Sequence, residues 1–327
     1  MEQEEKRAGG RLLRILVKYS GLMLVLVLMV VIVTVKNPNF IKIENVIGVL
    51  RQMSIYGVMG VGMAILIING YFDLSVGAIA GLCGVLAAMV MNAGGNMVAA
   101  ILTALAAGIA IGVFDGLVVC TTKIPAFVFT LAMTQVVRGA IYLITGGSPV
   151  TGLTKGYLAI GKDSWFGVPI PIYVMFAVMF LGWVLLNHTA MGRSIYATGG
   201  NPTAARYSGL KINRITLFSF GLCGAAAAVG GILLSSKLQS AQPTMGVSYE
   251  MDAISVAAIG GTSLAGGEGS IGGVLLGAMI LGVINNGMVM MGINSYWQMV
   301  VKGTVIAGAV IIDIARKSSN GRKTKKA

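Results

Sequence analysis

The sequence predicts an all-α, polytopic membrane protein with about ten transmembrane helices. Hydrophobic residues make up 56% of the 327 residues, a further 47 residues are glycine, and 11% are charged. The charged residues gather at the two ends and in short connections. They leave apolar runs of roughly 20 residues, which is the length that crosses about 30 Å of hydrocarbon. A soluble globule could not hide so much apolar surface, so we expect a single transmembrane domain over 1–327.

Ten apolar segments carry this prediction. They lie at about 15–35, 54–69, 75–92, 97–121, 124–145, 170–187, 215–235, 252–265, 270–291 and 296–315. An even number of spans puts both termini on the same side of the bilayer. The N-terminal arm at 1–18 and the tail at 316–327 are rich in Lys and Arg, which short segments retain in the cytoplasm, so both termini are expected there.

Two long connections separate the spans. The 188–214 connection contains Arg193, Arg206, Lys211 and Arg214 and no acid. Ten spans place it on the cytoplasmic side, in agreement with its charge. The 146–169 connection falls outside, where it can meet an extracytoplasmic partner. The net charge of +13 therefore sits in loops beside apolar segments, and no surface suited to nucleic acid is expected.

Glycines recur four residues apart in two regions, a spacing that places bare backbone along one helix face. Such ridges favour close packing between membrane helices. The glycines are Gly108, Gly112, Gly116, Gly269, Gly273 and Gly277.

Two polar, glycine-containing segments, 69–77 and 260–267, interrupt apolar pairs and look alike. Both are predicted at the same membrane face. One interpretation is a weak internal repeat with parallel halves, and the other is two ordinary tight turns. Glycine-rich breaks in corresponding positions can mark a transport path. The candidate path or gate residues are Asn69, Asp73, Ser75, Thr262, Ser263, Asn285 and Asn286.

No motif supports a bound cofactor, a metal or a catalytic centre. The 156–162 segment is similar to a phosphate-binding loop, but Asp163 stands where a hydroxyl must bind magnesium. The GxGxxG pattern at 267–272 lies between membrane spans and not in a βαβ unit. The lone His188 has no second histidine with which to share a metal, and the three cysteines lack any metal-binding spacing.

Three ionisable residues inside predicted spans, Asp115, Arg138 and Lys302, require partners or a wet cavity. A proton-coupled carrier would use such groups as a relay. No span carries two acids at helical spacing, so structural pairing is the favoured interpretation. The sequence does not identify the partners.

The 192–209 segment, GRSIYATGGNPTAARYSG, resembles the cytoplasmic loop of bacterial monosaccharide permeases, and looks most like that of the ribose importers. Members that carry galactose, xylose, arabinose or a quorum-sensing furanosyl compound look similar, so the sugar stays open. Further matching strings occur in order along nearly the whole chain: PNF at 38–40, DLSVG at 73–77, GSPV at 147–150, SAQPT at 240–244, the 260–267 segment and NNG at 285–287.

The resemblance implies the permease subunit of an ATP-driven (ABC) importer in the bacterial inner membrane. Its partners would be a second permease copy, a cytoplasmic ATP-binding subunit and an extracytoplasmic sugar-binding protein. The chain has no usable ATP site of its own, so it would be a transport subunit and not an enzyme. The resemblance places the ATPase coupling contact in the 188–214 connection, at Gly199, Gly200, Asn201, Ala204, Ala205, Arg206, Ser208 and Gly209.

The coupling segment also has local helix signals. Asn201 suits an N-cap, and Pro202 is tolerated at the first helical position. A short helix over 203–208 would then end at Gly209. The alternative is a plain amphipathic loop on the lipid headgroups.

Three other functions are weighed against a sugar importer. A secondary carrier would run on a proton or sodium gradient. A membrane-embedded enzyme would need paired carboxylates, a histidine cluster or a nucleophile with its base at one membrane face, and none is found in the sequence. A branched-chain amino-acid permease is a competitor within the same class.

Overall fold

The computed structural model describes residues 2–122, 124–304, 306–308 and 311, with side chains from residue 19 onward. The basic tail at 316–327 lies outside the described residues. In chain order the elements are α1 (Glu2–Lys36), the 3₁₀ helix η1 (Pro38–Ile41), α2 (Ile43–Ile68), α3 (Val76–Asn92), α4 (Met97–Thr122), α5 (Ala126–Thr145), α6 (Lys155–Lys162), β1 (Ser164–Trp165), β2 (Val168–Pro169), α7 (Ile170–His188), α8 (Ala190–Gly200), α9 (Pro202–Tyr207), α10 (Ile212–Leu238), α11 (Tyr249–Ile259) and α12 (Ile271–Met290). Residues 295–304 form a further helix.

The predicted all-α membrane fold is confirmed. Seven of the described helices, α1, α2, α4, α5, α7, α10 and α12, are long and apolar enough to cross a bilayer. The apolar helix α3 is shorter, at 17 residues. The last predicted span, at 296–315, is helical where it is described, and its remaining residues lie outside the description.

The predicted span at 252–265 differs from the structure. Its helix, α11, has 11 residues and ends at Ile259, so it is about 16 Å long at 1.5 Å per residue, too short to cross the hydrocarbon alone. The chain then turns through glycines with positive φ, at Gly261, Gly266 and Gly267. Glycine adopts the left-handed conformation at no steric cost, so the helix can stop here although residues 260–265 carry no charge.

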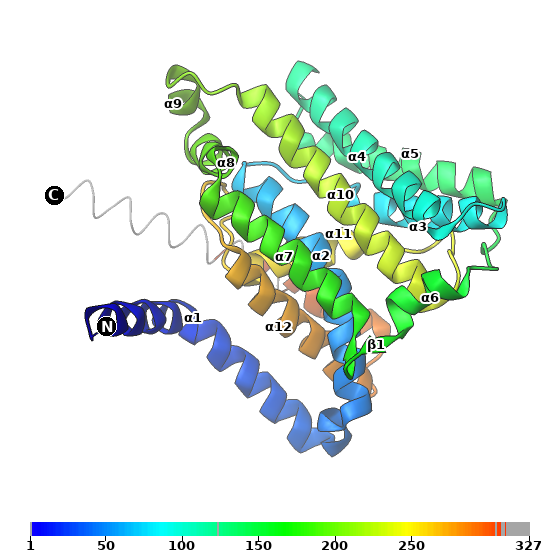
Figure 1. Cartoon of the computed structure of the whole chain (residues 1–327), viewed down its shortest axis with the longest axis horizontal. Coiled ribbons are helices and arrows are strands. Elements are labelled where there is room, and N and C mark those ends of the chain that lie inside the picture. The colour runs from blue at the N-terminus through cyan, green and yellow to red at the C-terminus, as the bar shows by residue number, and fades with distance from the viewer. Residues whose placement is uncertain (1, 123, 305, 309–310, 312–327) are drawn as a thin grey trace.

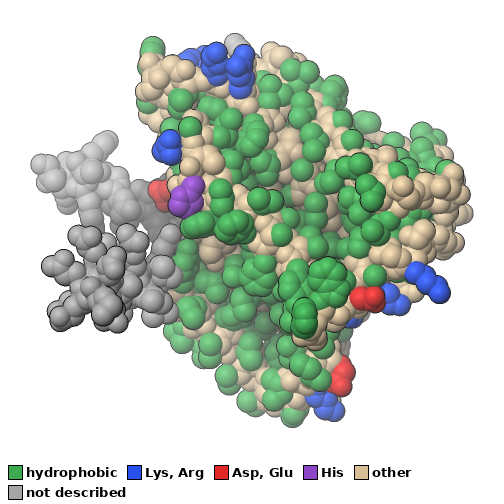
Figure 2. All heavy atoms as spheres, in the orientation of Figure 1, with side chains coloured by type: hydrophobic (Ala, Val, Ile, Leu, Met, Phe, Trp, Pro, Cys, Tyr) green, Lys and Arg blue, Asp and Glu red, His purple; other side chains and the backbone are tan. Residues whose placement is uncertain are grey.

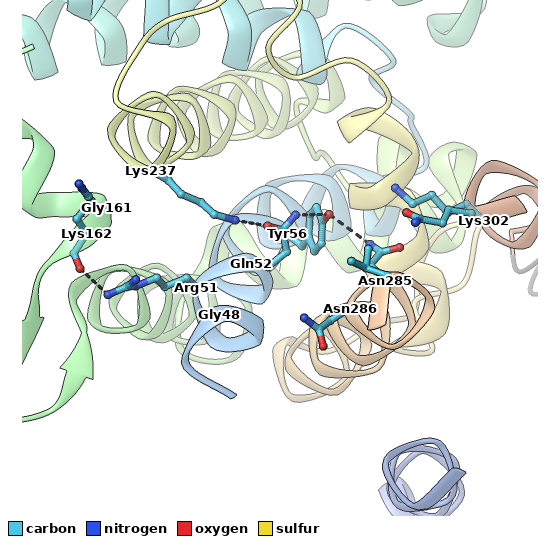
Figure 3. Close-up of a pocket in the computed structure, with 12 residues that line it drawn as sticks. Gly48, Arg51, Gln52, Tyr56, Gly161, Lys162, Lys237, Asn285, Asn286 and Lys302 are labelled. Carbon is cyan, nitrogen blue, oxygen red and sulfur yellow. Dashed lines mark hydrogen bonds between the residues drawn. The ribbon is translucent and has the colours of Figure 1, made fainter. Parts of the chain in front are cut away.

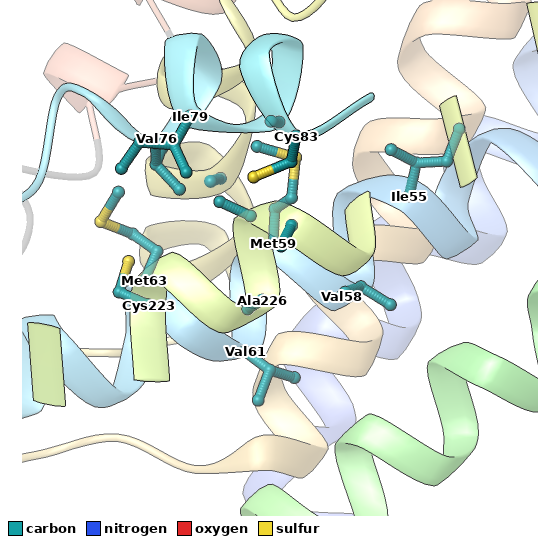
Figure 4. Packing of buried hydrophobic residues seen from close by; sticks show 14 of the residues in the cluster. Ile55, Val58, Met59, Val61, Met63, Val76, Ile79, Cys83, Cys223 and Ala226 are labelled. Atoms are coloured by element: carbon teal, nitrogen blue, oxygen red, sulfur yellow. The ribbon is translucent and has the colours of Figure 1, made fainter. Parts of the chain in front are cut away.

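The centre of the bundle is formed by α2 and α10, while α1, α4 and α5 lie outside them and expose more of their apolar surface (Figure 1). Met59 and Met63 of α2 pack with Cys223 and Ala226 of α10 (Figure 4). The two helices run in opposite directions, because Gly62 lies against Ala226 and the later residue Asn69 against the earlier Thr216. Every residue of α2 from Met53 to Ile68 is buried.

The two glycine ridges lie at helix crossings, as predicted. On α4, Gly108 and Gly112 face the backbone carbonyls of Gly224 and Phe220 on α10. On α12, Gly273 faces the carbonyl of Gly260 at the end of α11, and Gly277 faces that of Val256. A Cβ atom at any of these four ridge positions would overlap backbone, so the helices approach this closely because the side chain is absent.

The connections share the two ends of the bundle in the alternating order that the predicted spans require. At one end, Asn37 donates to the Met290 carbonyl at 2.8 Å. At the other end, the Gly267 amide donates to the Ile68 carbonyl at 2.8 Å. The first end gathers 37–42, 146–169 and the start of 239–248, and the second gathers the start of 69–75, 188–214 and 260–270. Between the two ends, Gly246 lies against Gly77 inside the bundle.

The directions of α2 and α11 agree with a parallel internal repeat. The Tyr56 and Tyr249 rings pack with centroids 5.5 Å apart, and further along, Gly60 lies against Val256. Both helices therefore run the same way, and both end in a glycine-containing break at the same end of the bundle.

The 146–169 connection is folded onto the bundle through α6. The Tyr157 hydroxyl lies 2.7 Å from the Ser235 hydroxyl, and the Ser236 hydroxyl lies 2.7 Å from both the Tyr157 carbonyl and the Gly161 amide. Burial raises the pKa of Tyr157 to about 12, so this phenol keeps its proton at neutral pH. The Arg51 side chain of α2 donates to the Lys162 carbonyl at 2.5 Å and fixes the end of α6.

The crossing at Gly273 yields a stability prediction. In Gly273→Leu the side chain would meet the Gly260 backbone, and overpacking of this kind costs about 1–3 kcal/mol or more. The yield of folded, monodisperse protein in detergent and its thermal midpoint should both fall. Gly139→Leu is the matched control, because a Cβ added there on α5 meets nothing within 4 Å. Equal yields and midpoints for the two variants would contradict the crossing.

Candidate functional site

A polar cavity of about 530 Å³ lies among α2, α10 and α12 at the end of the bundle that carries α6 (Figure 3). Its volume is within the roughly 300–1,000 Å³ typical of small-molecule sites. Most of the side chains around it donate or accept hydrogen bonds, although the surrounding helices are apolar. They include Arg51, Gln52, Tyr56, Lys237, Asn285 and Lys302.

A chain of hydrogen bonds crosses this cavity from α10 to α12 (Figure 3). The Lys237 ammonium contacts the Gln52 side-chain oxygen. The Gln52 amide nitrogen donates to the Tyr56 hydroxyl oxygen at 2.5 Å, and Asn285 donates to the same oxygen at 3.2 Å. Three helices thus place four polar side chains in one connected network.

Cations stand around the same cavity. Arg51 and Lys162 lie on the α6 side, and Lys237 lies between them and Tyr56 (Figure 3). Lys302, from the last described helix, forms a 2.7 Å ion pair with Asp252 of α11. The cavity therefore holds several positively charged side chains beside amide and phenol groups that can form hydrogen bonds with a hydroxyl.

Sequence reasoning missed Arg51, Gln52, Tyr56 and Lys237. The sequence did offer one signal for this site, because Gln52 and Lys237 are polar side chains at the ends of apolar spans. Which of these ends would meet could not be inferred, because α2 and α10 are separated by more than 140 residues in the chain.

The predicted path or gate residues do not form a single cluster. Asn285 and Asn286 line the polar cavity. Asn286 is engaged there with Asn45 through two reciprocal amide hydrogen bonds of 2.9 and 3.0 Å. The other five lie at the opposite end, in the two breaks that follow α2 and α11: Asn69, Asp73, Ser75, Thr262 and Ser263.

At that opposite end, α8 meets both breaks through bare backbone. A Cβ atom on Gly199 would overlap the Ile68 carbonyl oxygen and the Gly267 amide. The Gly267 amide already donates to that carbonyl, so the three segments share one point. We call the contact of Ile68, Gly199 and Gly267 the glycine junction.

A tyrosine holds α8 at the glycine junction. The Tyr196 hydroxyl donates to the Gly269 carbonyl at 2.9 Å. Burial raises the pKa of Tyr196, which keeps the phenol protonated and able to donate. Backbone contact and this hydrogen bond therefore join α8 to the last residue of α2 and to the 260–270 break.

The coupling segment predicted from the sequence forms a short helix beyond α8. The Asn201 side chain accepts from the Ala204 amide at 3.0 Å, and Pro202 is the first residue of α9, as the cap signals predicted. Gly209 has φ +83°, which matches a left-handed helix stop. Ala205 is buried, whereas Gly200, Asn201, Ala204, Arg206, Ser208 and Gly209 are exposed.

A basic groove lies beside α9. Arg206, Lys211 and Arg214 line a cavity of about 420 Å³ between α9 and the start of α10. Figure 2 shows Lys and Arg side chains gathered there. Three cations in one groove favour an acidic partner surface.

Two of the three intramembrane ionisable residues, Lys302 and Arg138, have partners for their charge, whereas Asp115 is bound through one oxygen only and its Oδ1 atom has no hydrogen-bond partner among the described residues. Lys302 pairs with Asp252. Arg138 donates to the Met245 carbonyl at 2.5 Å. The fully buried Asp115 accepts from the Ser75 hydroxyl at 3.0 Å, and that hydroxyl also lies 2.6 Å from Asp73.

The glycine junction gives a second prediction. Gly199→Ala would force the Ile68 and Gly267 backbones apart, at a cost of about 1–3 kcal/mol. Its neighbour offers the control, because a Cβ on Gly200 meets nothing within 4 Å. Thermal unfolding in detergent should show a lower midpoint for Gly199→Ala and no change for Gly200→Ala. Identical midpoints would mean that α8 does not press on α2.

The comparisons with known proteins agree with the resemblance found in the sequence. A family model described as branched-chain amino acid transport system / permease component matches residues 45–310. The ribose import permease protein of Escherichia coli (strain K12) is 43% identical over 297 residues, which cover 89% of this chain and 92% of the relative. That of Bacillus subtilis (strain 168) is 42% identical over 301 residues, or 91% and 93%.

The L-arabinose transport system permease protein of Escherichia coli (strain K12) is 36% identical over 293 residues, covering 90% of this chain and 89% of the relative. No solved structure matches the chain. Because the family model and these relatives span most of its length, the chain belongs to the family of branched-chain amino acid transport system permease components.

Proposed function

We propose that this chain is the permease subunit of an ATP-driven sugar importer, with ribose or a similar monosaccharide as its cargo. The observation that carries the proposal is the arrangement of α2. One end of this buried helix lines the polar cavity at Gln52 and Tyr56, and its other end forms the glycine junction at Ile68. From Tyr56 to Ile68 the helix rises about 18 Å. One rigid element therefore joins a cavity of the size of a small polar molecule to α8, which leads into the exposed helix α9.

The cavity has the chemistry that a monosaccharide requires. Amide, phenol and cationic donors surround it, and each can bond a sugar oxygen. The relatives reported above are named for ribose and L-arabinose, which are small neutral sugars. We therefore place the cargo's entry into the permease at this cavity.

The partners follow from the two ends of the bundle. The basic groove beside α9 is proposed to receive an acidic surface of the cytoplasmic ATP-binding subunit. The cavity end, with the folded 146–169 connection, is proposed to face an extracytoplasmic sugar-binding protein. This orientation puts the basic 188–214 connection and both termini in the cytoplasm.

A second permease copy completes the proposed importer, as the family resemblance implies. Apolar surface that the second copy does not cover would face lipid. The mass of the complex purified in detergent checks this composition, because a complex with a single permease copy would contradict it.

A proton-driven carrier is less well supported. Such a carrier needs ionisable groups that are free to exchange protons along a path. Within the described part of the chain, Arg138 and Lys302 are engaged with a carbonyl and a carboxylate. These two contacts are those of structural pairs, while Asp115 is held through one oxygen by the Ser75 hydroxyl.

The proposed function predicts ATP-dependent uptake by the complete assembly. Proteoliposomes containing this permease and its ATP-binding subunit should accumulate radiolabelled ribose when the sugar-loaded binding protein is on the cavity side and ATP is on the α9 side. Vanadate should block the uptake. Uptake that follows a proton or sodium gradient without ATP would contradict the function, and uptake with the two additions exchanged would contradict the orientation.

A fourth prediction concerns Arg206. A guanidinium can donate to a carboxylate through two parallel hydrogen bonds, so Arg206→Glu should turn an attraction in the groove into a repulsion. We expect copurification of the ATP-binding subunit and ATP hydrolysis stimulated by the loaded binding protein to fall about tenfold or more. Membrane insertion and docking of the binding protein should be retained.

The control for this variant is Arg193→Glu. Arg193 is exposed on α8 and lies outside the groove lining, so this variant makes the same change of charge in the same connection. If Arg206→Glu and Arg193→Glu behave alike, or if both keep full stimulation, then Arg206 is not a coupling contact.

A further inference from the structure

The hydrogen-bond chain in the polar cavity has a fixed direction at its α10 end. The Lys237 ammonium has protons to donate and no lone pair to accept with, so it must donate to Gln52. This fixes the side-chain oxygen of Gln52 toward Lys237. The amide nitrogen of Gln52 then points at Tyr56 and donates to its hydroxyl oxygen at 2.5 Å. Tyr56 is thus an acceptor toward Gln52.

At the α12 end of this hydrogen-bond network, the side-chain amide of Asn285 lacks one hydrogen-bond partner. The Tyr56 oxygen also faces the side-chain nitrogen of Asn285 at 3.2 Å, and the Asn285 side-chain oxygen has no hydrogen-bond partner among the described residues. Turning the Asn285 amide over would let Tyr56 donate to that oxygen, but the amide nitrogen would then lose its acceptor. In either orientation, half of a buried amide is unpaired, which costs about 1–3 kcal/mol.

The missing partner is best supplied by a hydroxyl group. A hydroxyl both donates and accepts, so it can complete either orientation of Asn285. A carboxylate can only accept and an ammonium can only donate, so each fits one orientation alone. Asn285 and Tyr56 both line the cavity (Figure 3).

The position of the Tyr56 hydroxyl is rigid. The residue is 4% exposed, and its ring packs against the Tyr249 ring with centroids 5.5 Å apart and planes at 51°. The Gln52 bond holds the hydroxyl from a second direction. A group held in this way discriminates between ligands by position, because it cannot move to meet a misplaced partner.

We propose that Tyr56 and Asn285 are specificity-determining residues of the permease, which bind a hydroxyl of a neutral monosaccharide as it passes through the cavity. This inference rests on the proposed sugar import and adds a selection step within the membrane subunit, after capture by the binding protein. Gln52 and Lys237 are positioning residues, since they act by orienting Tyr56.

The test uses the complete transporter in proteoliposomes, with ribose as the probe and its binding protein saturated. Tyr56→Phe keeps the ring and removes the hydroxyl, and Asn285→Ala removes the amide. Both variants should retain ATP hydrolysis stimulated by the loaded binding protein, because neither substitution touches the 146–169 connection or the glycine junction. The number of ribose molecules imported per ATP hydrolysed should fall about tenfold, as expected for the loss of one ligand hydrogen bond.

Two matched variants separate selection from folding. Tyr173→Phe removes a hydroxyl that donates to the Trp165 carbonyl outside the cavity, and it should leave ribose import per ATP unchanged. Asn37→Ala removes an amide that donates to the Met290 carbonyl and lies outside the cavity lining, so it should lower the yield of folded protein while the protein that does fold keeps its import per ATP.

The outcomes are distinct. If Tyr56→Phe and Asn285→Ala import as much ribose per ATP as the wild type, the two residues do not bind the cargo and the proposal is overturned. If Tyr56→Phe loses folded protein and stimulated hydrolysis together, its role is structural, which also overturns it. If the wild-type assembly shows no ATP-dependent import of ribose, L-arabinose or galactose, it is the proposed function that fails.

Discussion

The close backbone packing at the end of α2 is the contact on which the rest of the molecule depends. The last carbonyl of that helix accepts a hydrogen bond from Gly267 and lies directly against Gly199. A helix end normally leaves its final carbonyls without intrahelical partners. Here the 260–270 break supplies one, and the glycine of α8 lets the third segment reach the same point. Two membrane breaks and the 188–214 connection are joined without any large side chain between them.

Several features of the fold could be predicted from the sequence because their causes are local. The N-cap at Asn201, the stop at Gly209 and the glycine ridges each follow from a short pattern whose physical effect does not depend on distant residues. The end of α11 was placed wrongly, since residues 260–265 are apolar enough to continue a span. The left-handed turns at Gly261, Gly266 and Gly267 end the helix instead, and hydropathy does not detect them.

The candidate site was predicted less well because it is made by tertiary contact. Gln52, Lys237 and Asn285 come from three helices, and no spacing in the sequence shows that their ends converge. The predicted gate set combined residues from different parts of the bundle. A polar residue in an apolar span indicates that it needs a hydrogen-bond partner, but it does not indicate how deep in the membrane the residue lies. Asn286 is an instance: it has that partner in Asn45, and its neighbour Asn285 is left incomplete.

The folding of α6 onto the bundle has a consequence for any protein that binds at the cavity end. Tyr157, Ser236 and Arg51 tie this connection to α10 and α2, so its backbone is ordered before a partner arrives. Ordering a loose loop during association costs conformational entropy, and a surface that is already ordered avoids that cost. A partner landing here would therefore meet a preorganised platform, and its affinity would report the fit of two fixed surfaces.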